Sequence, residues 1–223
     1  MSFKPVTLTT EQIERASQAL LASFAEANPA LPLFPTPVED IAEFFLQYEL
    51  VFTDEGLYAD PNFLGGICFE GDVIYLNASL ERNEGRLAFT VAHEIGHHCL
   101  HKQAYLEYLK GQTPEILCRE ASDKPLIERQ ADQFAACLLL PKNEMIERWH
   151  KPNIKNVYDA YNEATSFMRL HGISNVSISA LINRLIDLSL IPDVGYQTGP
   201  PKRRKYHPVR VAIYKLKKLF GLK

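Results

Sequence analysis

The stretch TVAHEIGHHCLH, residues 90–101, places His93 and His97 four positions apart, with Glu94 directly after the first histidine. Side chains four residues apart lie on one face of a helix, so both imidazoles can bind one ion. Neutral imidazole is a preferred zinc ligand, and the adjacent carboxylate can reach a water on that ion. We therefore predict a zinc site with His93 and His97 as ligands and Glu94 as the catalytic base.

A solvent-exposed helix that is merely rich in histidine is the alternative. The interior Gly96 argues against this alternative, because glycine lowers helix stability by about 1 kcal/mol relative to alanine. His101 continues the stripe of His93 and His97, but it lies about 11–12 Å from His93 along an unbroken helix. One ion with bonds of about 2 Å cannot bind all three. His98 and His101 are therefore expected not to bind the metal.

A hydrolytic zinc site needs a third protein ligand and an open fourth position. Glu128 opens a helical stretch, and spacing alone does not choose between Glu128 and Glu120 as that ligand. Asp132 follows Glu128 by one turn and is expected to accept the free N–H of one of the two histidines, which would fix the tautomer of that imidazole. Manganese or iron could occupy the same ligands.

The rest of the chain shows mainly helical periodicity. Two strands joined at residues 70–72 are predicted within residues 65–76, and prolines mark residues 28–37 as a linker. The class is therefore α+β, with a small antiparallel sheet ahead of the histidine-bearing helix. The predicted helices cover residues 10–26, 38–48, 86–109, 126–140, 156–170 and 177–189.

Two blocks, FTVAHEIGH at residues 89–97 and ERQADQFAACLLLP at residues 128–141, resemble those of the ImmA/IrrE family of metallopeptidases. The resemblance implies a compact zincin in which His93, His97 and Glu128 hold zinc and Glu94 acts as base. It therefore favours Glu128 over Glu120. The chain carries Asp132 where many members carry asparagine, and either side chain can orient a histidine.

The resemblance further implies a protein substrate, because members cleave helix-turn-helix repressors that control mobile-element, phage or stress genes. We thus expect a regulatory zinc endopeptidase in which metal-activated water attacks a peptide carbonyl and Glu94 is the general base. The strand 73–76 could align an extended substrate or be an ordinary core strand. The group that stabilises the oxyanion is not determined by the sequence, and the candidates are Tyr105, Tyr158, Tyr161 and His171. The alternative function is a metal-stabilised regulatory protein that sequesters its partner without proteolysis.

Three regions are expected: a metallopeptidase domain with its N-terminal helix at 1–150, a helical subdomain at 151–195, and a basic amphipathic tail at 196–223. The subdomain has the rhythm of a helix-turn-helix. Its second helix offers only Arg184 against Asp187, so no sequence-specific DNA binding is expected. The tail has nine basic and no acidic residues from 202 onward and could make weak contact with nucleic acid or a membrane surface.

The remaining features point to a cytoplasmic protein. No apolar run approaches the roughly 20 residues of a membrane-spanning helix, and residues 1–14 lack the apolar core of a signal peptide. The four cysteines are widely spaced, without a CxxC pair, so free thiols are expected.

Overall fold

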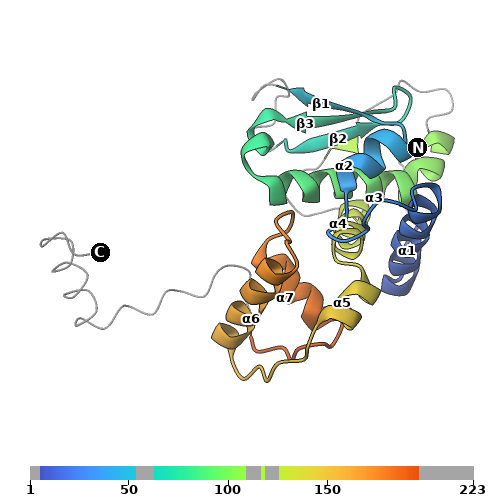
Figure 1. Cartoon of the computed structure of the whole chain (residues 1–223). Helices are drawn as coiled ribbons and strands as arrows, with labels where there is room; N and C mark the ends of the chain where they lie inside the picture. Colours follow the sequence, from blue (N-terminus) through green and yellow to red (C-terminus); the bar gives the residue numbers. More distant parts are fainter. Residues whose placement is uncertain (1–5, 54–62, 109–116, 119–125, 196–223) are drawn as a thin grey trace, which may run out of the picture.

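A long central helix separates a small sheet from the helices that follow it in the chain (Figure 1). The computed structural model describes residues 6–53, 63–108, 117–118 and 126–195, so Glu120 and the predicted tail lie outside the described residues. The elements are α1 (Thr10–Ala27), α2 (Val38–Asp40), the π-helix η1 (Ile41–Phe45), β1 (Glu49–Thr53), β2 (Gly65–Cys68), β3 (Val73–Asn77), the 3-10 helix η2 (Ala78–Arg82), α3 (Glu84–Tyr108), β4 (Leu117–Cys118), α4 (Leu126–Leu139), α5 (Lys142–Arg148), α6 (Val157–Leu170) and α7 (Ile178–Asp187).

The sheet has the strand order β1-β3-β2-β4, and its parallel pair was not predicted. Strands β2 and β3 form the predicted antiparallel hairpin, but β1 pairs with β3 in parallel, so the sheet is mixed rather than wholly antiparallel. The α+β class is confirmed. The helix predicted over 38–48 ends at Phe45, and the chain enters β1 four residues later.

Strand β3 cannot align a substrate by accepting an added strand. Its five residues pair with β1 on one side, and residues 73–76 pair with β2 on the other. Because both hydrogen-bonding edges are occupied, the prediction that residues 73–76 bind an extended peptide is wrong. The alternative, an ordinary core strand, is confirmed by the complete burial of Ile74 and Leu76.

Helix α3 is buried on all sides in its middle, because it lies between the sheet and α4 (Figure 1). All eight residues from Thr90 to His97 are buried. Gly96 permits this packing, since a Cβ added there would lie 3.1 Å from the Cα of Ala131 in α4 and 3.2 Å from its carbonyl oxygen. The close approach of α3 and α4 thus accounts for a glycine inside a helix.

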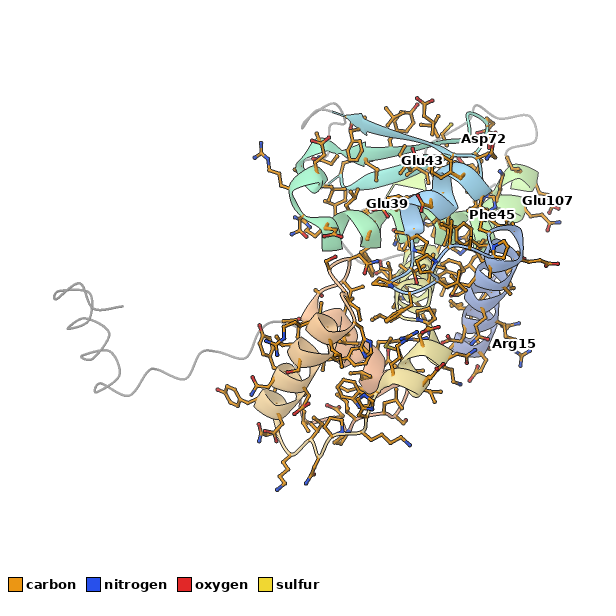
Figure 2. The ribbon with its side chains drawn as sticks, viewed as in Figure 1. Arg15, Glu39, Glu43, Phe45, Asp72 and Glu107 are labelled. Carbon is orange, nitrogen blue, oxygen red and sulfur yellow. The ribbon has the colours of Figure 1, made fainter. Side chains whose placement is uncertain are left out.

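Helix α1 packs mainly against α4 and also contacts α3, and it begins as a well-capped helix. Thr9 accepts a hydrogen bond from the backbone N–H of Gln12, whose side chain accepts one from the backbone N–H of Thr9. Phe45 of η1 points toward α1 (Figure 2), and its ring meets that of Phe24 edge-on with centroids 5.7 Å apart. These contacts attach the first 45 residues to the core.

The C-terminal helices α6 and α7 join the core through a buried arginine. Ser177 caps α7 by accepting from the N–H of Ala180. Arg184 of α7 is 5% exposed; it donates to both carboxylate oxygens of Glu14 in α1, at 2.7 and 2.8 Å, and to the carbonyl of Leu140 at 3.0 Å. The one basic residue considered for DNA contact on this helix therefore serves an internal ion pair. The boundaries at 150 and 195 stay a prediction.

Candidate metal centre

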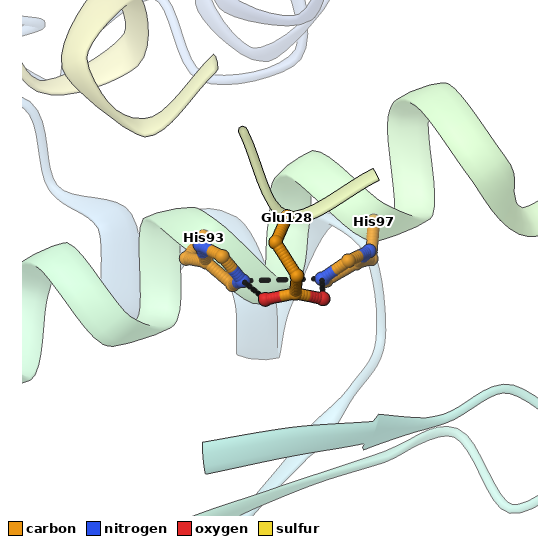
Figure 3. Close-up of side chains that lie close together, drawn as sticks. All are labelled: His93, His97 and Glu128. Carbon is orange, nitrogen blue, oxygen red and sulfur yellow. Dashed lines mark hydrogen bonds and ion pairs between the residues drawn. The ribbon is translucent and has the colours of Figure 1, made fainter. Parts of the chain in front are cut away.

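Helices α3 and α4 bring three predicted ligands to one point (Figure 3). His93 and His97 lie one turn apart on α3, and their Nε2 atoms are 3.1 Å from each other. Glu128, in the first turn of α4, places Oε2 3.2 Å from Nε2 of His93 and Oε1 3.3 Å from Nε2 of His97. The two histidines are fully buried and Glu128 is 3% exposed.

This spacing fits a tetrahedral zinc ion. Bonds of about 2.0–2.1 Å separated by tetrahedral angles place neighbouring ligand atoms roughly 3.3 Å apart. The two Nε2 atoms, 3.1 Å apart, are close to that edge length, and each lies 3.2 or 3.3 Å from a different oxygen of the Glu128 carboxylate; one ligand atom from each side chain lies within 4.8 Å of the others. Two imidazole nitrogens and a carboxylate are also the donor set of hydrolytic zinc sites, and they leave a fourth position for water. The residues present can therefore hold zinc.

Glu94 is completely buried next to this group, where the sheet leaves it room. Gly65 of β2 faces it: a Cβ added to this glycine would lie 3.4 Å from Oε1 of Glu94 and 2.6 Å from Cγ2 of Thr90. Thr90 precedes Glu94 by one helical turn. Because any side chain at residue 65 would overlap Thr90, the glycine keeps open the space in front of the carboxylate.

Asp132 supports His93 from the second turn of α4. Its Oδ1 lies 3.0 Å from Nδ1 of His93. A carboxylate can only accept here, so Nδ1 of His93 carries the hydrogen and Nε2 points to the metal position. The sequence left open which histidine Asp132 would orient, and the structure shows that it is His93.

His101 does not reach the metal position, as expected from its distance along α3, yet it contacts the site from behind. Its Nδ1 lies 3.1 Å from Nδ1 of His97, on the side of that ring away from the metal position. Its Nε2 lies 3.0 Å from Oε1 of Gln130. Sequence reasoning gave these two residues no role at the site; the spacing of four residues between His97 and His101 is the only local signal of their contact.

Burial and hydrogen bonding set the charges of the metal-free site. Burial opposes protonation of His93, but its hydrogen bonds with Asp132 and Glu128 outweigh burial and raise its pKa to about 9. Burial lowers the pKa of His97 to about 4. Burial also opposes ionisation of Glu128, but hydrogen bonds with both histidines lower its pKa to about 2. A protonated His93 therefore faces an ionised Glu128, and a bound cation replaces that proton.

The other candidates have contacts elsewhere. Nδ1 of His98 lies 2.8 Å from the hydroxyl of Tyr48, so His98 faces away from the ligands as predicted. Among the oxyanion candidates, Tyr105 packs against Phe69, about 12 Å beyond His97 along α3. His171 packs against Phe167, and Tyr158 is 40% exposed. Tyr161 is partly buried against the core.

Cysteines take no part in this donor set. Cys68, Cys99 and Cys137 are free thiols, as expected, while the side chain of Cys118 lies outside the described residues. Among the helices that the structure describes, none is both long enough and apolar enough to cross a membrane.

The comparison with protein families gives a match whose bounds include the whole candidate site. The matching family is the M78 peptidase family, described as the IrrE N-terminal-like domain, and the match covers residues 49–185, more than half of the chain. It begins at β1 and ends within α7. The comparison with curated proteins gives no match. The histidine helix, the glutamate helix and this match agree: the chain belongs to the M78 peptidase family, whose characteristic domain is the IrrE N-terminal-like domain.

Proposed function

We propose that this protein is a cytoplasmic zinc endopeptidase that regulates transcription by cleaving a helix-turn-helix repressor. The observation that supports it most is the spacing of the His93, His97 and Glu128 ligand atoms at 3.1 to 3.3 Å, with Glu94 buried beside them. Membership of the M78 peptidase family supports peptide hydrolysis. The repressor follows from the resemblance to the ImmA/IrrE metallopeptidases.

In this proposal each side chain has one task. His93, His97 and Glu128 hold the ion, and Asp132 keeps His93 in the tautomer that binds through Nε2. A bound zinc ion supplies a Lewis acid that lowers the pKa of water and polarises a carbonyl. Glu94 takes a proton from the attacking water and passes it to the nitrogen of the leaving amine.

A groove that begins at Thr90, one helical turn before Glu94, suits the side chain of a peptide substrate. The cavity has a volume of about 370 Å³ and lies between the start of α3, the strand β2 and the start of α7. Leu64 and Thr90 line it. Leu64 directly precedes Gly65 in the chain, and Thr90 lies against Gly65 in the structure. Phe89, Val176 and Ala180 add apolar surface to the lining, which also includes the polar Asn83 and Arg86. We propose that it accepts an apolar side chain near the bond that is cut.

The test compares Glu94→Gln with the wild type and with Glu107→Gln. Glu107 is an exposed glutamate near the end of the same helix (Figure 2), so its substitution controls for the loss of one carboxylate. Each zinc-loaded protein is incubated with a proteome-derived peptide library and with purified helix-turn-helix repressors, including any that is encoded beside its gene. New N-termini are then identified by mass spectrometry.

We expect all three proteins to bind zinc equally and only Glu94→Gln to lose cleavage, by about 100-fold or more. Cleavage by Glu94→Gln at the wild-type rate would rule out Glu94 as the base. If the wild type binds a repressor and relieves repression while the repressor chain stays intact, sequestration replaces proteolysis as the function.

A further inference from the structure

A chain of three hydrogen bonds runs from the metal centre to the backbone before α1. It leads from Nδ1 of His97 to Nδ1 of His101, at 3.1 Å, and from Nε2 of His101 to Oε1 of Gln130, at 3.0 Å. Nε2 of Gln130 then donates to the carbonyl oxygen of Val6, at 3.0 Å. The three side chains are buried, with exposed fractions of 0%, 3% and 3%.

The far end of this chain fixes the direction of every hydrogen bond in it. A backbone carbonyl only accepts, so the amide nitrogen of Gln130 must face Val6 and its oxygen must face His101. That oxygen also only accepts, so His101 carries its hydrogen on Nε2 and presents a lone pair at Nδ1. His97 must then donate from Nδ1, which leaves the lone pair of its Nε2 for the metal.

The opposite arrangement is disfavoured at each step. Rotating the amide of Gln130 would place its oxygen against the carbonyl oxygen of Val6, two acceptors without a hydrogen between them. A hydrogen on Nδ1 of both His97 and His101 would place two donors face to face at 3.1 Å. Both of these alternative arrangements would bury polar groups without hydrogen-bond partners, which costs about 1–3 kcal/mol for each group.

We propose that His101 and Gln130 are positioning residues that hold His97 in its metal-binding tautomer. Together they form a hydrogen-bond relay whose fixed end is the carbonyl of Val6. Asp132 does the same for His93 through one direct contact. The two imidazoles are therefore oriented by different means: a carboxylate orients one, and a neutral relay that reaches the N-terminal segment orients the other. The inference rests on the metal centre of the proposed function, and peptide cleavage is not needed for it.

The direct test is the position of the ring hydrogens in the zinc-loaded wild-type protein. Proton–nitrogen correlation spectra of the histidine side chains, recorded with ¹⁵N-labelled histidine, distinguish the two neutral tautomers and the cation. We expect a hydrogen on Nδ1 of His97 and a hydrogen on Nε2 alone of His101. A hydrogen on Nδ1 of His101, in the neutral or the cationic ring, would overturn the proposal. This measurement needs no variant, so it does not depend on the folding of any mutant.

Zinc affinity, measured by competition with a chromogenic chelator, tests the relay by substitution. His101→Leu removes the acceptor for His97, whereas His101→Asn can keep an amide oxygen near the same place. Gln130→Leu removes both the acceptor for His101 and the donor to Val6. Gln103→Leu, at an exposed position of α3, is the control.

We expect the two leucine variants of the relay to raise the zinc dissociation constant about 10–100-fold. His101→Asn should recover most of the loss caused by His101→Leu, and Gln103→Leu should match the wild type. Wild-type affinity in His101→Leu, or equal losses in His101→Leu and His101→Asn, would overturn the proposal. A wild type that binds no zinc would instead refute the proposed function, and a wild type that binds zinc without cutting peptides would leave the relay intact.

Discussion

Substitution of Gly96 by alanine tests whether close contact between α3 and α4 sets the metal geometry. The added Cβ would meet three atoms of α4: the Cα of Ala131 at 3.1 Å, its carbonyl oxygen at 3.2 Å, and the Cβ of Phe134 at 3.3 Å. Carbon atoms in ordinary contact are about 3.5–4.0 Å apart, so α4 must retreat by roughly 0.5 Å. Two of the three atoms belong to the backbone, so no side-chain rotation can relieve the contact.

The substitution should have a small effect on fold stability and a larger effect on zinc affinity. Overpacking of this kind costs about 1–3 kcal/mol, and alanine returns up to about 1 kcal/mol of helix propensity. The free energy of unfolding of the metal-free protein should thus fall by about 0–2 kcal/mol. Ala131 lies between Glu128 and Asp132, and metal–ligand distances tolerate only about 0.2 Å. Zinc affinity should therefore fall by about 10-fold or more.

The assay combines urea unfolding of the metal-free proteins with zinc competition on the folded ones. Gly85→Ala is the matched control, because Gly85 lies in the first turn of the same helix and an added Cβ there meets its nearest atom at 3.5 Å. This control should keep wild-type affinity, and its free energy of unfolding should rise by no more than about 1 kcal/mol of helix propensity. If Gly96→Ala binds zinc like the wild type and is stabilised by about 1 kcal/mol, helix propensity alone governs the site and the packing argument is refuted.

Three further perturbations have defined outcomes. The pKa of His93 is raised from 6.5 to about 9, so its proton stabilises the metal-free fold fully below pH 6.5 and this contribution is lost as the pH rises through 9. Zinc must displace that proton, so calorimetry at pH 7.5 in buffers of different ionisation enthalpy should show release of about one proton per zinc; a heat independent of buffer would contradict this pKa. Arg184→Met strands Glu14 without its buried partner and should lower the free energy of unfolding by about 3 kcal/mol in urea titrations, whereas the exposed Arg129→Met should change it by less than about 0.5 kcal/mol. Chelation should lower the Tm of the wild type but not that of His97→Ala, and equal shifts in both would place the metal elsewhere.

Local spacing in the sequence was sufficient to predict the α3 half of the metal centre. Four residues between His93 and His97 determine a shared helical face wherever the helix packs. Glu128 lies on another helix, and spacing alone did not distinguish it from Glu120 as the third ligand. Only the resemblance to a known family favoured Glu128. The structure then placed its carboxylate 3.2 and 3.3 Å from the imidazoles.

Interactions between distant parts of the chain were beyond reach of the sequence. The hydrogen bond between Gln130 and Val6 joins residues 124 positions apart, and no local sequence pattern near either residue predicts it. The parallel pairing of β1 with β3 is of the same kind, because the residues of β1 also fit a loop after the preceding helix. The ion pair of Arg184 with Glu14 is a further example, because it joins residues 170 positions apart.

X-ray absorption at the zinc edge of the loaded protein is the most direct test of a centre made by two histidines and one glutamate. The spectrum should fit two imidazole nitrogens at about 2.0–2.1 Å with carboxylate and water oxygens at about 2.0–2.2 Å. Glu128→Ala should remove one oxygen and most of the affinity. A sulfur scatterer near 2.3 Å, or an unchanged spectrum in Glu128→Ala, would show that the metal is bound by other residues.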